Sequence, residues 1–214
     1  VDESHCVSQW GYDFRPSYFK IAALRGLKKE VPVLALTASA TDKVKDDIID
    51  KLELKDCNTF RQSFAKPNLQ YVVELQQDKP KRINEILSKV PGSALVYCRN
   101  RKKTQKIATF LKTCGIDADF YHAGLSNTNR LNKQNAWIKG DTRVMVCTNA
   151  FGMGVDKADV RTVIHIDLPD AIEAYYQEAG RAGRDGKRAF AVLLFHPEDE
   201  EAITEMSNKQ FPDI

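Results

Sequence analysis

The chain has 214 residues, of which 43% are hydrophobic and 29% charged, and this balance is ordinary for a folded globular protein. The composition excludes disorder as the main state, and the lack of any run of about 18 apolar residues excludes a membrane-spanning helix. The net charge of +3 neither requires nor excludes nucleic acid, because a basic stripe can lie on one face of a nearly neutral protein.

The first part of the chain predicts an incomplete α/β unit. Residues 33–36 form an apolar run typical of a strand, and residues 44–52 place apolar side chains on one face of a helix that Thr41 would cap. Before them lie an aromatic-rich loop and a helical pattern over about residues 17–29. These elements are too few to close a core.

Apolar strands and amphipathic helices alternate in the rest of the chain. We expect strands over residues 94–98, 118–121, 144–147, 162–166 and 189–195. Ser126 would cap a helix that carries Leu131, Trp137 and Ile138, and Pro197 would begin the last helix. The alternation predicts an α/β fold with a parallel sheet covered on both faces.

A proline after Lys66 breaks the pattern, so we place a domain boundary there. Residues 1–66 are then the C-terminal part of one α/β domain, and residues 67–214 are a complete second domain.

Five cysteines without C-x-x-C spacing argue against a zinc site or a disulfide framework within this chain. Cys98 and Cys147 lie in apolar runs and are expected to be buried thiols. This usage indicates a reducing compartment, either the cytoplasm or the nucleus.

Two segments near the start carry candidate chemistry. Asp2 and Glu3 could hold a magnesium ion and orient a water molecule, or they could be a solvated surface pair. Residues 8–16 hold three aromatic side chains and Arg15, together with a glycine and a proline. Such side chains could stack on unpaired bases or fold back as a small satellite core.

Two later segments combine glycines with charged residues. In residues 148–156 the glycines could let the backbone approach a phosphate, and Asp156 could meet a ribose, although plain turn chemistry is the alternative. In residues 176–186, Arg181 and Arg184 lie among three glycines at the end of a predicted helix. They could favour the helix dipole, or they could reach a phosphate and stabilise a transferring phosphoryl group.

Taken in order, these segments resemble the RecQ family of DNA helicases, within helicase superfamily 2. Residues 2–5 resemble the family's D-E-x-H box, residues 8–16 its aromatic-rich loop, and residues 176–186 its motif VI. The matches to motifs III, IV, a further conserved block and motif V lie at residues 37–41, 97–101, 121–125 and 148–157. The resemblance covers essentially the whole chain.

The resemblance implies two RecA-like domains of the P-loop NTPase type, with ATP in the cleft between them. Asp2 would hold Mg²⁺ and Glu3 would activate the attacking water. Arg184, with Arg181, would reach the γ-phosphate, and Gln177 would assist. Gly154 and Asp156 would also belong to the nucleotide site.

The resemblance further implies that single-stranded and forked DNA are the partners. His5 and the aromatic-rich loop would couple DNA contact to hydrolysis, and Arg101 and Thr148 would contact the DNA backbone. The loop residues implied are Gln9, Trp10, Phe14 and Arg15. The motor would step 3′ to 5′ and unwind duplexes in repair or recombination, at the bacterial nucleoid or in a eukaryotic nucleus.

The chain departs from the family in one large respect, because no G-x-x-x-x-G-K-[ST] phosphate loop occurs in it. We therefore expect a piece of a longer protein that does not hydrolyse ATP alone. Two alternatives stay open: a nucleic-acid-binding module without catalysis, and an RNA-directed motor of the same superfamily.

Overall fold

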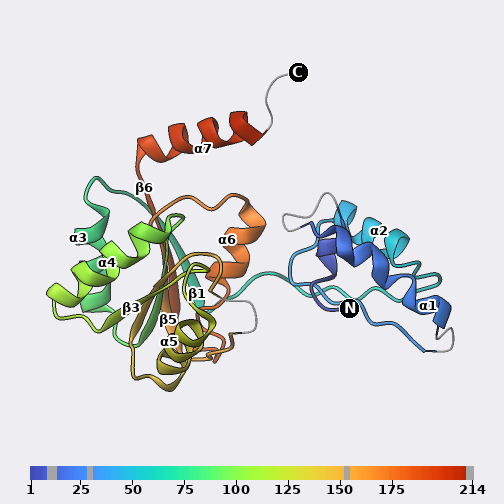
Figure 1. Cartoon of the computed structure of the whole chain (residues 1–214), viewed down its shortest axis with the longest axis horizontal. Helices are drawn as coiled ribbons and strands as arrows, with labels where there is room; N and C mark the ends of the chain where they lie inside the picture. The colour runs from blue at the N-terminus through green and yellow to red at the C-terminus, as the bar shows by residue number, and fades with distance from the viewer. Residues whose placement is uncertain (9–13, 28–30, 152–154, 211–214) are drawn as a thin grey trace. The chain divides into compact units, whose positions relative to one another are not determined.

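The computed structural model describes residues 1–8, 14–27, 31–151 and 155–210 (Figure 1). The chain forms two compact units. The first unit comprises Val1–Ala65 with Ala171–Gln177, and the second comprises Lys66–Asp170 with Glu178–Ile214.

The first unit is built from short helices around a small apolar cluster. Its elements are η1 Ser4–Val7, η2 Pro16–Ile21, α1 Leu24–Leu27 and α2 Asp42–Lys51. Val7 packs against Val44 and Ile48 of α2, and the Thr41 hydroxyl accepts a hydrogen bond from Val44 N at 3.3 Å. The predicted helix over residues 44–52 and its N-cap are therefore confirmed.

The strand predicted over residues 33–36 is wrong. Leu36 N donates to Val1 O and Ser4 N donates to Leu36 O, both at 2.9 Å, but this neighbouring segment turns into η1 instead of extending. The described part of the first unit contains no strand. Because the neighbouring segment is not extended, the hydrogen-bond ladder of a sheet does not continue beyond these two bonds. Leu34 and Leu36 stay exposed.

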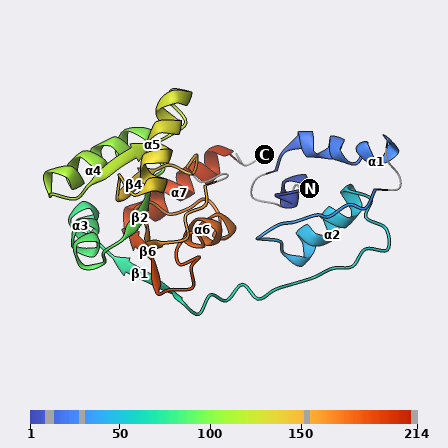
Figure 2. The same cartoon turned by 90° about the horizontal axis from the view of Figure 1, so that it is seen from below.

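The second unit is a single parallel sheet with the strand order β1-β6-β5-β2-β4-β3 (Figure 2). Its strands are β1 Leu69–Leu75, β2 Ser93–Tyr97, β3 Ala118–Tyr121, β4 Val144–Cys147, β5 Val160–His165 and β6 Ala189–Phe195. Every described pairing in it is parallel. The predicted α/β class and its parallel sheet are confirmed.

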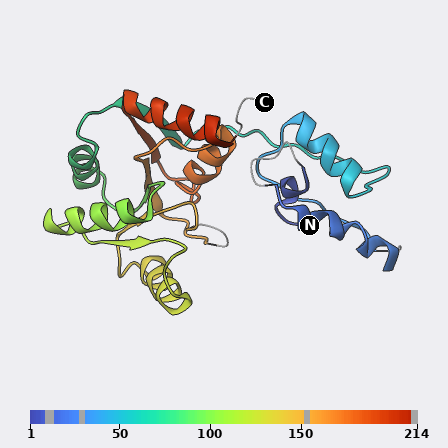
Figure 3. The ribbon, with the colours of Figure 1, turned by 45° about the horizontal axis from the view of Figure 1, so that its top comes forward.

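Helices follow most of the strands along the chain. They are α3 Lys79–Lys89, α4 Arg101–Thr113, α5 Asn127–Lys139, α6 Ile172–Ala179 and α7 Pro197–Gln210. α7, drawn in red in Figure 3, begins at Pro197 as predicted, directly after β6. Lys79 Nζ ties the start of α3 to α7 by donating to Asp199 Oδ2 at 2.5 Å. None of the described helices is long and apolar enough to cross a membrane.

The main core lies between one face of the sheet and the helices α3 and α4, which lie on the same side of it (Figure 2). Ile83 and Leu87 of α3 and Leu111 of α4 are fully buried there against alternate residues of the strands. On the opposite face, Trp137 of α5 packs edge-on against Phe151, with ring centroids 5.4 Å apart. The sheet therefore has a packed layer on each face, and its strand ends are held in fixed positions.

Two elements escaped the sequence prediction. β1 and α3 were not predicted, although Ile83 and Leu87 carry a helical spacing. In α5, Ser126 caps the helix as predicted. Trp137 is buried, whereas Leu131 and Ile138 are 58% and 37% exposed. One large aromatic side chain of α5 therefore covers the sheet.

Candidate functional site

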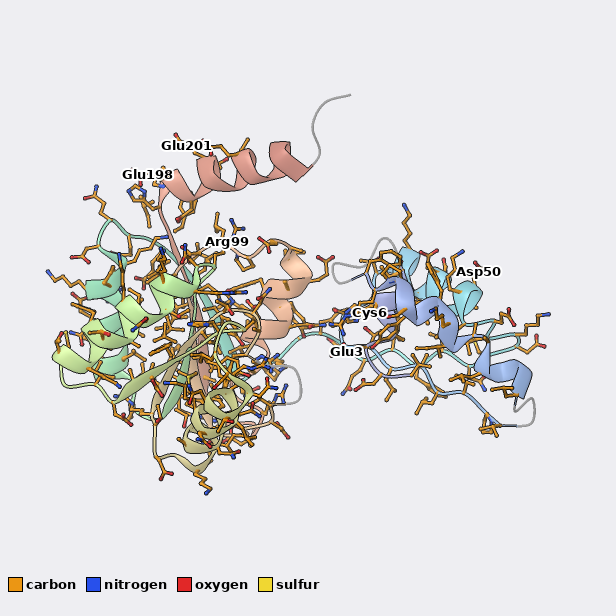
Figure 4. All side chains as sticks on the ribbon, in the orientation of Figure 1. Glu3, Cys6, Asp50, Arg99, Glu198 and Glu201 are labelled. Carbon is orange, nitrogen blue, oxygen red and sulfur yellow. The ribbon has the colours of Figure 1, made fainter. Side chains whose placement is uncertain are left out.

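The D-E-x-H box forms a turn at the start of the first unit, where Figure 4 labels Glu3 and Cys6. Asp2 and Glu3 are both exposed, and Glu3 N donates to Asp2 Oδ1 at 2.9 Å. Glu3 adopts a left-handed backbone with φ of 47°, which ends the preceding segment and begins η1. No cluster of three or more potential metal ligands occurs among the described side chains.

His5 joins the box to the segment that resembles motif III. Its side chain is 1% exposed, and its Nδ1 lies 2.9 Å from Thr37 Oγ1 and 3.4 Å from Glu3 Oε2. Thr37 Oγ1 also accepts a hydrogen bond from Ser39 N at 3.3 Å. The structure therefore brings together three side chains that the sequence placed in two separate motifs.

The aromatic-rich loop is described only at its ends. Gln9, Trp10 and Tyr12 lie outside the described residues. Phe14 packs against Phe19, with ring centroids 5.5 Å apart, and Arg15 N donates to Cys6 O at 2.8 Å. This end of the loop is anchored on the first unit by an aromatic contact and a main-chain hydrogen bond.

Several predicted residues gather at the carboxyl end of the sheet in the second unit. Arg101 begins α4 just after β2, and Thr148 follows β4 directly. A methyl group added at Gly124 would lie 3.1 Å from Arg101 Nη1 and 3.2 Å from His122 Nδ1, so these side chains flank the turn after β3. Thr148 N donates to Tyr121 O at 3.2 Å. Ligands of open α/β sheets bind beyond this edge.

Arg101 and Thr148 differ in exposure. Arg101 is exposed, and its guanidinium lies beside the Gly124 turn. Thr148 is 7% exposed, and its hydroxyl accepts a hydrogen bond from Ala150 N at 3.4 Å. The geometry therefore makes Arg101 a solvent-accessible cation and gives Thr148 a role in shaping the turn after β4.

The two residues proposed for the nucleotide site in separate motifs form an ion pair. Arg184 Nη1 donates to Asp156 Oδ1 at 2.6 Å, and their side chains are 39% and 81% exposed. Gly154 lies outside the described residues. An exposed pair of this kind contributes little to stability, so the carboxylate can exchange with another anion at low cost.

Arg181 lies deeper than Arg184, although both line one small pocket beside Trp137 and Phe151. Burial raises the pKa of Tyr97 well above its ordinary value, the nearby Cys147 thiol raises it further, and the Arg181 guanidinium acts in the opposite direction. Burial likewise raises the pKa of Cys147, which is 0% exposed as predicted for this thiol. Arg181 therefore adjoins the buried layer beside β2 and β4.

Glu178 is a site residue that the sequence did not reveal. Its Oε2 lies 2.8 Å from His165 Nε2, and the His165 ring is 1% exposed and stacks on Tyr97 at 5.1 Å. His165 is thus a buried strand residue with a polar partner. The pair ties the end of β5 to the last turn of α6, and Glu178 lies three residues before Arg181. Gln177 precedes Glu178 on the same helix.

Comparisons with known proteins agree with this geometry. Residues 78–186 match the helicase conserved C-terminal domain. The chain is 42% identical over 200 residues to the ATP-dependent DNA helicase RecQ of Pasteurella multocida, covering 93% of this chain and 32% of that protein. It is 43% identical over 215 residues to the probable ATP-dependent DNA helicase RecS of Bacillus subtilis, covering 97% and 43%.

A solved structure shows the same fold at lower identity. Dbp5 of S. cerevisiae, bound to RNA and ADP BeF3, superposes with a TM-score of 0.75 and 22% identity, covering all of this chain and 56% of that one. The chain spans about a third of the length of the RecQ protein it matches, as the 32% coverage states. The chain belongs to the family defined by the helicase conserved C-terminal domain and, within it, to the RecQ-like proteins.

Proposed function

We propose that this chain is part of an ATP-dependent DNA helicase of the RecQ type. The relatives at 42% and 43% identity carry that activity in their names, and the resemblance extends over both units of the chain. The likeness to the RNA-bound structure, at 22% identity, concerns the fold alone. DNA is therefore the favoured nucleic acid, and RNA is an outcome that the experiment below can reveal.

The observation that carries the proposal is the exposed Arg184, held by Asp156 at 2.6 Å. A guanidinium on a short loop that pairs with a replaceable carboxylate is suited to donate to phosphate oxygens instead. During hydrolysis Arg184 would stabilise the charge that develops on the transferring phosphoryl group, an effect of about 10³–10⁵ in rate. Arg181, beside the buried Tyr97, would support it from the deeper layer.

Asp2 and Glu3 fit the hydrolytic side of this chemistry. Magnesium in nucleotide sites is held by one or two carboxylates together with phosphates and water, and the exposed Asp2 carboxylate meets that need. When bound, the ion would neutralise charge on the phosphate oxygens. Glu3 would orient the attacking water. His5 Nδ1 lies 3.4 Å from Glu3 Oε2 and 2.9 Å from Thr37 Oγ1, so His5 would couple changes at the D-E-x-H box to the segment around Thr37.

The nucleic-acid side of the proposal involves Arg101, His5 and the aromatic-rich loop. Arg101 faces outward at the carboxyl end of the sheet and would neutralise a DNA phosphate. Trp10 would stack on an unpaired base, and Thr148 would shape the adjoining turn. We further propose that the motor moves 3′ to 5′ on single strands and opens forked DNA in repair or recombination. The protein would act at the nucleoid of a bacterium or in the nucleus of a eukaryote.

We also propose that the active protein is longer than this chain, because a phosphate loop is needed for tight nucleotide binding. Isolated, the chain would bind ATP poorly. Calorimetry that measured micromolar ATP affinity for the isolated chain would contradict this part of the proposal.

The decisive variant is Arg184→Ala in the intact protein, with phosphate release measured in the presence of single-stranded DNA. We expect turnover to fall by about 10³ or more while ATP binding is retained, because the arginine acts in the transition state. Arg61→Ala is the matched control, since Arg61 pairs with the exposed Asp42 at 2.9 Å. Normal turnover of Arg184→Ala would remove the arginine from the mechanism.

The same assay separates the alternatives. Stronger stimulation by RNA than by DNA would favour an RNA-directed motor. Nucleic-acid binding without hydrolysis in the intact protein would favour a non-catalytic module.

A further inference from the structure

A short segment at the junction of the two units is bonded to the loop that carries both arginines. We call residues 180–187 the arginine loop. Lys66 Nζ donates to Gly180 O at 2.6 Å. Asn68 Nδ2 donates to Gly183 O at 2.7 Å and to Lys187 O at 2.9 Å. All of these contacts lie within the second unit.

The geometry leaves the Asn68 amide one orientation. Two carbonyl oxygens face the same side-chain nitrogen, so that nitrogen must be the donor NH₂ group. The Asn68 main chain is fixed as well, because Ala189 N donates to Asn68 O at 2.9 Å. Asn68 therefore bridges both ends of the turn that contains Arg184 to the first strand pair of the sheet.

Lys66 acts at the other end of the arginine loop. Gly180 directly follows α6, where carbonyl groups lack helical partners and the helix dipole favours a cation. Burial lowers the pKa of Lys66, and the positive charge of Arg184 lowers it further. The Lys66 ammonium therefore lies beside the loop at a cost in desolvation and charge repulsion, and the bond to Gly180 O fixes where it lies.

Space is also short at the centre of this contact. Gly183 has a φ of +66°, and a methyl group there would lie 2.5 Å from Asn68 Nδ2 and 3.0 Å from Lys187 O. The loop and the junction segment are therefore in close contact, and a displacement of one displaces the other.

We infer that Lys66 and Asn68 are positioning residues for Arg184, and that the segment joining the two units in sequence sets where the arginine loop stands. The inference rests on the proposed role of Arg184 in hydrolysis. Residues 66–68 would then do more than connect the two units in sequence. Because Lys66 and Asn68 donate to the carbonyl oxygens of Gly180, Gly183 and Lys187, a change in the path of the chain at residues 66–68 would move the arginine loop.

The test uses the intact protein and the variants Asn68→Ala and Lys66→Met, with Lys66→Arg as the conservative rescue. Asn58→Ala and Lys112→Met, both at exposed positions, are the matched controls. DNA-stimulated phosphate release gives kcat and KM for ATP, and thermal unfolding gives the folded fraction. Hydrogen exchange of the amides in residues 181–187 reports the order of the loop directly.

We expect kcat to fall about tenfold or more in Asn68→Ala and Lys66→Met, because a misplacement of about 1 Å can cost about 10²-fold in rate. KM for ATP should change less than about threefold, and exchange in the arginine loop should accelerate. Lys66→Arg should restore most of kcat, since a guanidinium can also donate to Gly180 O.

Two results would overturn the inference. One is a kcat within about twofold of the parent for both variants while Arg184→Ala abolishes hydrolysis. The other is a loss of kcat no larger than the loss of folded protein, which would make the contact merely structural. If Asn68→Ala does not fold, Lys66→Met and its rescue decide by the same criteria. Full activity of Arg184→Ala itself would instead remove Arg184 from the mechanism, which is the part of the proposed function on which this inference rests.

Discussion

The glycine at position 183 offers a quantitative test of the arginine loop. Gly183→Ala places a Cβ at a residue with φ of +66°, 2.5 Å from Asn68 Nδ2 and 3.0 Å from both Ala189 Cβ and Lys187 O. The asparagine side chain can swing aside, but only by giving up its hydrogen bonds to Gly183 O and Lys187 O. The neighbouring carbonyl and methyl group have no such freedom.

The expected cost is the sum of two physical effects. Placing alanine in the left-handed region costs about 1 kcal/mol. Losing two side-chain hydrogen bonds costs about 1 kcal/mol each, which brings the total to about 3 kcal/mol. Gly140→Ala is the matched control, because Gly140 has a φ of +90° and nothing within 4 Å of its added Cβ. The control should lose only the backbone contribution of about 1 kcal/mol.

Urea unfolding followed by circular dichroism measures both variants against the parent chain. Their free energies of unfolding should differ by about 2 kcal/mol, which corresponds to roughly 4–8 °C in Tm for a chain of this size. The comparison cancels the change that alanine makes in the unfolded state. Equal losses, within about 0.5 kcal/mol, would show that Asn68 does not hold the loop.

Two further perturbations test the packing and the charges of the second unit. Trp137→Ala should lower the free energy of unfolding by about 3–5 kcal/mol, because Trp137 is 1% exposed. Leu131 lies on the same helix but is 58% exposed, so Leu131→Ala should change the free energy of unfolding by no more than about 0.5 kcal/mol. Similar losses for the two variants in urea unfolding would contradict the observed buried face of α5. The Arg82 guanidinium lowers the pKa of Glu74, to which it donates at 2.6 and 2.8 Å, so Glu74→Gln should lose about 1 kcal/mol at neutral pH. A lowered pKa stabilises the fold in full above the ordinary value of the carboxyl, and this contribution is lost as the pH falls through the lowered pKa of the folded state. The loss in Glu74→Gln should therefore shrink progressively as the pH falls below about 4, and a loss at about pH 2 as large as that at neutral pH would refute the assignment.

The sheet was predictable where apolar runs were continuous and flanked by turn residues. Residues 118–121, 144–147 and 189–195 form β3, β4 and β6 as predicted, since buried parallel strands are apolar on both faces. β1 was missed because it is an edge strand in which Tyr71 and Val73 are 45% and 67% exposed. Its sequence alternates less clearly than that of a central strand.

The first unit shows the opposite failure. Residues 33–36 are as apolar as a strand, yet no described strand lies beside them, because the segment they bond to turns into η1. A local sequence pattern indicates the propensity to form a strand, whereas a hydrogen-bonded strand also needs a neighbouring segment in extended conformation. The helix after it was predictable because Thr41, Val44 and Ile48 carry a cap and a spacing that need no distant partner.

The candidate site was predictable as a set of residues but not as a set of contacts. Sequence order identified Asp156 and Arg184 separately, and only the structure pairs them at 2.6 Å. The partnership of His165 with Glu178 and the bonds from Lys66 and Asn68 join residues 13 to 119 positions apart. Sequence spacing carries no signal for such contacts, because the fold alone brings these positions together.

The measurement that tests the account most directly is phosphate release by the intact protein, with and without single-stranded DNA, for the parent and for Glu3→Gln. The variant keeps the size of the side chain and removes the carboxylate that would orient the attacking water. We predict strong stimulation by DNA in the parent and its loss in Glu3→Gln. Absence of hydrolysis in the parent under both conditions would contradict the helicase assignment and leave the motifs as a binding scaffold.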